Sequence, residues 1–134
     1  MKCRLAILPL LLLAGCGASN QPSSAEKFKG EERAVAQKVE ELQQAGERRE
    51  PETICTDILA RSLVQQLEAA GADCTEEMQK AIEDADDYAL DVTDVTISGS
   101  NATVKVRRGE DGPTETMEFT QEGGQWRATS LSGS

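Results

Sequence analysis

Residues 90–108, LDVTDVTISGSNATVKVRR, carry the pattern that decides the fold. Apolar and polar side chains alternate along this stretch, as expected for β-strands that bury one face. The turn-forming residues GSN interrupt the alternation, so the stretch predicts a β-hairpin. Near Asp94 the alternation slips, which predicts a β-bulge or a bend in the first strand. The second strand directs Ala102, Val104 and Val106 inward and Thr103, Lys105 and Arg107 outward.

The alternation continues towards the C-terminus. The segments GEDGP and EGG supply two more turns, and each is followed by a further alternating run. We therefore expect a four-stranded antiparallel meander with strands at about 90–98, 102–108, 114–120 and 125–131. The side chains expected to line the inner face of this sheet are Val104, Val106, Met117, Phe119 and Trp126.

Three amphipathic helices are predicted before the sheet, at about 25–45, 52–70 and 74–88. Their apolar residues recur at helical spacing, as Val35, Val39 and Leu42 do in the first. Asp73 followed by Glu76 is typical of a capping box at the start of the third helix. Helices followed by alternating strands predict an α+β fold, with one domain at 25–134 whose helices pack against the four-stranded sheet.

The N-terminal residues have the features of an export signal. Lys2 and Arg4 precede a short apolar run that cannot span a membrane. The tetrapeptide LAGC, which ends at Cys16, resembles the lipobox of bacterial lipoproteins. The resemblance implies that residues 1–15 are a signal peptide and that Cys16 is acylated, with chains such as palmitate. Cys16 would then hold the protein on the extracytoplasmic face of the cell membrane through a flexible tether at 16–24, whereas a plain secretory signal would leave Cys16 unmodified.

Cys55 and Cys74 are expected to form a disulfide. They are the two cysteines left once Cys16 is acylated, and an oxidising compartment favours their pairing. A metal site would need more ligands, and the chain has no histidine and no CxxC spacing. A reactive thiol would need an electropositive setting, but two glutamates closely follow Cys74.

The chain is strongly acidic. Its formal net charge is −10, and removing residues 1–15, which carry two basic and no acidic residues, changes this to −12. Such a surface repels phosphate backbones, so nucleic acid is not expected as a partner. A basic strip on the outer sheet face is a candidate site for an acidic partner or a wall polymer. The strip comprises Lys105, Arg107 and Arg127, and the alternative is cross-strand pairing with Glu115, Glu118 or Glu122.

No catalytic residue, metal site or cofactor is expected. Without histidine, a general base would have to be a carboxylate such as Asp91 or Asp94. The acidic run from Glu83 to Asp94 fails the test for a calcium-binding loop. Counted from Asp84, its sixth position is alanine instead of glycine and its twelfth is valine instead of glutamate.

The segments ICTDIL, ADCTEEM, ISGSNATVKV and QWRATSL, in this order, resemble small bacterial lipoproteins with a nuclear transport factor 2-like, cystatin-like domain. The resemblance implies a sheet curved around the helices into a cone, often with a pocket at its open end. It implies no single function, because the fold hosts enzymes as well as binding domains. We expect a membrane-anchored, non-catalytic domain that binds a cell-envelope protein, polymer or small ligand through the cone or the outer sheet face. The alternatives are a hydrolase or dehydratase-like enzyme working from the cone, and a structural module that forms a homodimer.

Overall fold

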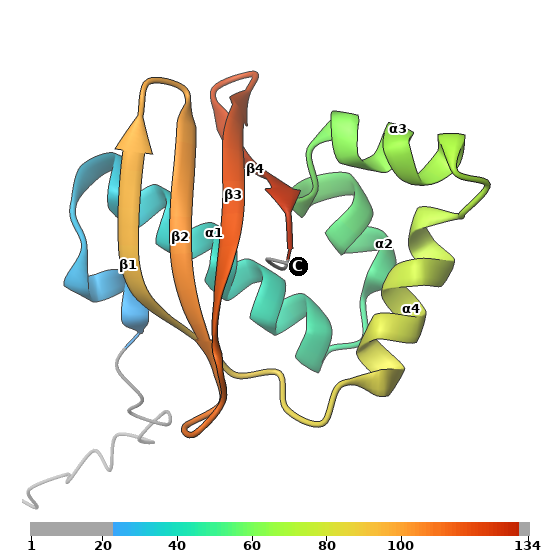
Figure 1. Ribbon diagram of the computed structural model, residues 1–134, viewed down its shortest axis with the longest axis horizontal. Coiled ribbons are helices and arrows are strands. Elements are labelled where there is room, and N and C mark those ends of the chain that lie inside the picture. Colours follow the sequence, from blue (N-terminus) through green and yellow to red (C-terminus); the bar gives the residue numbers. More distant parts are fainter. Residues whose placement is uncertain (1–22, 132–134) are drawn as a thin grey trace, which may run out of the picture.

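The computed structural model describes residues 23–131, in which helical segments come first and a four-stranded antiparallel sheet follows (Figure 1). The strands are adjacent in chain order: β1 (Leu90–Ser98), β2 (Asn101–Arg108), β3 (Thr114–Glu122) and β4 (Gln125–Ser130). The helical segments are η1 (Ser24–Lys27), α1 (Gly30–Glu47), α2 (Pro51–Thr53), the π-helix η2 (Ile54–Ile58), α3 (Arg61–Ala69) and α4 (Cys74–Asp84). The predicted α+β class and the meander are confirmed. The expected signal peptide and Cys16 lie outside the described residues.

The predicted irregularity in the first strand is a β-bulge at Thr93. Val92 pairs with Val106 and Asp94 pairs with Lys105, so Thr93 is the extra residue on β1. Because the bulge shifts the alternation by one position, Val92 and Val95 both face inward and are both buried. The slip in the sequence thus has a direct structural cause.

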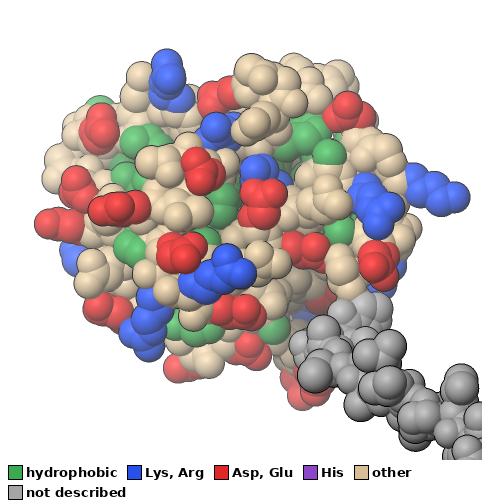
Figure 2. Space-filling view, turned by 180° about the vertical axis from the view of Figure 1, so that it is seen from behind, with side chains coloured by type: hydrophobic (Ala, Val, Ile, Leu, Met, Phe, Trp, Pro, Cys, Tyr) green, Lys and Arg blue, Asp and Glu red, His purple; other side chains and the backbone are tan. Residues whose placement is uncertain are grey.

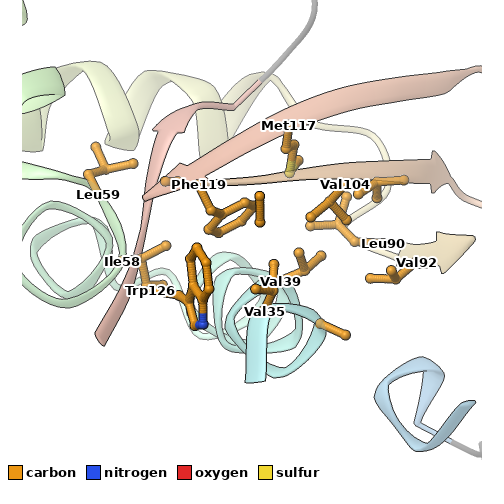
Figure 3. Close-up of a cluster of buried hydrophobic side chains, with 14 of the residues drawn as sticks. Val35, Val39, Ile58, Leu59, Leu90, Val92, Val104, Met117, Phe119 and Trp126 are labelled. Atoms are coloured by element: carbon orange, nitrogen blue, oxygen red, sulfur yellow. The ribbon is translucent and has the colours of Figure 1, made fainter. Parts of the chain in front are cut away.

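The inner face of the sheet is a packed core covered by α1, which crosses behind the strands (Figure 1). Val35 and Val39 of α1 approach Phe119 and Trp126, and Ile58 of η2 closes the cluster from the side (Figure 3). The expected inner-face residues Val104, Val106, Met117, Phe119 and Trp126 are at most 4% exposed. They therefore fill the concave side of the sheet and do not line an open cone.

The helix predicted at 52–70 is interrupted in its middle. Leu59 and Ala60 are extended and buried. Leu59 forms an isolated parallel bridge with Ala128, and the Ala60 amide donates to the Ala128 carbonyl at 2.8 Å. Hydrogen bonding to the free edge of β4 thus replaces helical hydrogen bonds at this point, and it places η2 and α3 beside the sheet.

The third predicted helix begins as expected but is shorter than 74–88. The Asp73 side chain accepts a hydrogen bond from the Glu76 amide at 3.0 Å, which confirms the predicted N-cap. The helix ends at Asp84, where the Tyr88 hydroxyl donates to the Ile82 carbonyl at 2.8 Å. This bond satisfies a carbonyl that the helix end leaves without a partner, so the chain leaves the helix four residues earlier than predicted.

The folded domain begins earlier than predicted, because part of the expected tether belongs to it. Ser24 is buried, and its hydroxyl accepts a hydrogen bond from the Val92 amide at 3.3 Å. The Glu40 carboxylate accepts bonds from the Ser23 hydroxyl and from the Ala25 amide. β1 is an edge strand whose outward amides need acceptors, which explains the bond from Val92 to Ser24, whereas Ser23 is bound by α1.

Replacing Ser24 by alanine is expected to lower the free energy of unfolding by about 1–3 kcal/mol, because the buried Val92 amide loses its acceptor. Urea denaturation followed by circular dichroism measures the change. Ser98→Ala, at the exposed end of the same strand, is the matched control and should change stability by less than about 0.5 kcal/mol. Equal effects of the two substitutions would contradict the role assigned to Ser24.

Candidate functional site

The expected disulfide is present. Cys55 and Cys74 are bonded, and their Cα atoms lie 6.1 Å apart. The bond joins η2 to the first residue of α4. It therefore fixes two helical segments to one another close to the edge of the sheet.

The three residues of the predicted basic strip do not form one strip. Lys105 and Arg107 lie near one end of β2, whereas Arg127 pairs across β3 with the other end. Two strand spacings and four residues along the strand place Lys105 about 17 Å from Arg127. Cross-strand pairing does occur at Arg107, but its partner is Asp91, with Nη2 donating to Oδ2 at 2.9 Å. None of the three glutamates expected as partners forms this ion pair.

Glu115 and the two candidate bases Asp91 and Asp94 have other surroundings than a catalytic site would need. Glu115 pairs with Arg108 at 2.6 Å, and Asp91 also lies 3.6 Å from the Lys27 ammonium. Asp94 is exposed beside the bulge. Between residues 23 and 131, no three histidine, cysteine, aspartate or glutamate side chains cluster so that they could hold a metal ion.

A cavity beside the edge of β4 was not predicted from the sequence. It has a volume of about 540 Å³ and lies where η2 and the start of α3 meet the turn between β3 and β4. These elements are neighbours in Figure 1, with α3 beyond the free edge of β4. The lining residues are Cys55, Thr56, Leu59, Arg61, Val64, Glu122, Gly123 and Arg127.

Glu122 fixes one rim of this cavity. Its carboxylate accepts the Arg61 amide at 2.9 Å and 3.3 Å. Arg61 is the first residue of α3, whose N-cap Ala60 offers no side-chain acceptor. Glu122, which is 61 residues away in the sequence, thus caps the helix and is favoured there by the helix dipole.

Arg127 also lines this cavity, and its side chain is held by a hydrogen bond. Its Nη1 donates to the carbonyl of Thr56 in η2. Because η2 ends two residues later, this carbonyl lies in a last turn that leaves acceptors without helical donors. A guanidinium has five N–H donors, so this bond orients the side chain and leaves further donors for another acceptor.

A second, smaller cavity of about 110 Å³ lies between α1, α4 and the start of β1. Its lining is mostly apolar, and it includes Leu42, Ile54, Met78, Ile82 and Leu131.

On the face covered by α1, acidic and basic side chains are interspersed and hydrophobic atoms appear only between them (Figure 2). That face therefore offers no single charged patch, and the larger cavity is the stronger candidate site.

No protein-family model, curated protein or solved structure matches this chain. The resemblance to the nuclear transport factor 2-like class therefore stays a prediction. In the described part of the chain, no helix has the length and apolar character needed to cross a membrane.

Proposed function

We propose that this protein is a lipid-anchored, non-catalytic binding domain of the bacterial cell envelope. The anchor is supported by the sequence LAGC after an apolar run, which resembles a lipobox at Cys16. The disulfide between Cys55 and Cys74 supports an oxidising compartment outside the cytoplasm. Ser23, the first described residue, follows Cys16 by seven positions, and a chain of that length can reach at most about 25 Å from the lipid.

The inner face of the sheet and its edge at β4 differ in how completely side chains fill them, and this difference supports a binding function. The inner face of the sheet is filled by side chains that are at most 4% exposed, whereas the edge of β4 borders a cavity of about 540 Å³. That volume is in the range of small-ligand sites. This cavity is the observation that carries the proposal.

Neither the composition of the chain nor the surroundings of its candidate base favour catalysis. The chain contains no histidine, and the residues facing into the sheet are apolar. The candidate base Asp91 is engaged by both Arg107 and Lys27. A general base needs a free position beside a substrate, so these observations favour a binding domain over a cone-pocket enzyme.

The anchor is tested by metabolic labelling with an alkyne analogue of palmitate in cells that express the full chain. We expect label on the wild-type protein in the membrane fraction and none on the Cys16→Ala variant. Cys55→Ala is the matched control, because it also removes a cysteine but should keep the label. Label on Cys16→Ala, or its absence from the wild type, would contradict the proposal.

A further inference from the structure

We propose that the cavity beside β4 is a binding site for a monocarboxylate with an apolar body, held by Arg61 and Arg127. The inference rests on the binding role proposed above and names the ligand class for it. The chemistry is that of a free organic acid or of a peptide C-terminus.

Within the described residues, neither guanidinium group forms an ion pair with a carboxylate. The ion pairs found among residues 23–131 involve Lys27, Lys38, Lys80, Arg107 and Arg108, and none includes Arg61 or Arg127. An exposed arginine needs no partner, so this alone decides nothing. The decisive point is that Arg61 and Arg127 both line the same cavity in a chain whose net charge is −10. They form a local positive site in an otherwise acidic domain.

The charge of the lining favours a monoanion. Arg61 and Arg127 contribute two positive charges and Glu122 contributes one negative charge, so the site is singly positive. Glu122 is held in place by the Arg61 amide and cannot turn away without uncapping α3. A monocarboxylate neutralises this charge, whereas a dianion such as phosphate or a dicarboxylate would leave one negative charge uncompensated in an acidic domain and would cost more desolvation. A planar carboxylate also matches the forked donors of a guanidinium.

Three residues of the lining supply an apolar wall for the body of the ligand. They are Cys55, Leu59 and Val64. Leu59 is held by its bridge to Ala128, and Cys55 by the disulfide, so this wall is rigid. Small-ligand sites commonly join such a wall to a few polar groups that set the orientation. A short aliphatic chain behind the carboxylate would fit this arrangement.

The test is an NMR titration of ¹⁵N-labelled protein comprising residues 16–134, with Cys16→Ser to avoid acylation and with the disulfide oxidised. The probes are hexanoate, the tripeptide acetyl-Ala-Val-Leu with a free C-terminus, the amides of both, succinate and inorganic phosphate. We expect the two carboxylates to shift the amide signals of Thr56, Arg61 and Gly123. The amides should bind at least tenfold more weakly, because they lack the charge. Tighter binding of the tripeptide identifies a peptide end, and tighter binding of hexanoate identifies a free acid; either outcome supports the site.

Arg61→Gln supplies the matched variant. The Arg61 side chain is exposed and makes no ion pair within residues 23–131, so the substitution should leave the melting temperature unchanged. We expect it to weaken carboxylate binding about tenfold or more. Arg48→Gln, at the exposed end of α1, removes the same charge at a distance and should leave the affinity within twofold.

Four results would overturn the inference. They are equal binding of acids and amides, tighter binding of succinate or phosphate than of hexanoate, equal effects of Arg61→Gln and Arg48→Gln, and no shift at the cavity with any probe. The labelling of Cys16 is independent of these measurements. A labelled protein that binds no carboxylate refutes this inference alone, whereas carboxylate binding by a protein that is never acylated refutes only the anchor.

Discussion

Replacing Cys55 and Cys74 together by alanine is expected to lower the free energy of unfolding by about 3 kcal/mol and the melting temperature by about 10–15 °C. The bond closes a loop between residues 19 apart in the sequence, which restricts the unfolded chain. The folded domain gains as well, because the bond joins η2 to α4. Urea denaturation measures the loss, and adding reductant to the wild type should reproduce it. Reductant should leave the double variant unchanged, and a wild type whose midpoint resists reductant would contradict the prediction.

The effect should also be local. α4 packs mainly on α2, α3 and η2, and the sheet is held separately by its own ladder and by α1. Loss of the bond therefore frees α4 before it disturbs the strands. Hydrogen exchange in the reduced protein should show faster exchange of amides in α4, while amides shared by β2 and β3 stay protected. Uniformly faster exchange would mean that the two layers unfold together.

The sheet could be predicted because its pattern is local. Side chains alternate with period two, and glycine-rich turns separate the strands, as at Gly123 and Gly124, which both adopt positive φ. Even the bulge at Thr93 left a visible slip, because an extra residue moves all later side chains to the opposite face. Each of these signals lies within a few residues of the feature that it predicts.

The helical layer was harder to predict because tertiary contacts override the local pattern. Leu59 and Ala60 continue the apolar spacing of a helix, and both are buried, as an inward helical stripe would also require. Pairing with Ala128 decides their conformation, and this partner lies far away in the sequence. Similarly, the local sequence around Ser24 is typical of a polar linker, and only the hydrogen bond from the distant Val92 amide makes Ser24 part of the fold.

The candidate cavity depends on the same distant contacts. The sequence identified Arg127 as facing outward and Cys55 as bonded, but gave no sign that Arg61 and Glu122 meet. Their contact exists because the chain leaves the helix at Leu59 and starts α3 beside the β3–β4 turn. The one available signal was the absence of a capping side chain at Ala60, which left the amides of α3 in need of an acceptor.

Phe119→Ala is expected to have the largest effect on stability, a loss of about 3–5 kcal/mol. Phe119 is 1% exposed and is one of only two phenylalanines in a chain with 3% aromatic residues. Its ring lies between the strands and α1, beside Trp126 and Ile58 (Figure 3). Since domains of this kind are stable by about 5–15 kcal/mol, the cavity left by the substitution would remove a large part of the total.

Phe119→Leu keeps most of the buried volume and should cost less than about 1.5 kcal/mol, which preserves a folded protein if the alanine variant does not accumulate. Glu118→Ala, the next residue on the exposed face, is the control and should change stability by less than about 0.5 kcal/mol. Urea denaturation compares the three variants with the wild type. A loss below about 1 kcal/mol for Phe119→Ala would mean that the concave face of the sheet holds free space. In that case a ligand site inside the sheet, and with it the enzyme alternative, would again compete with the cavity beside β4, because only a filled interior disfavours both.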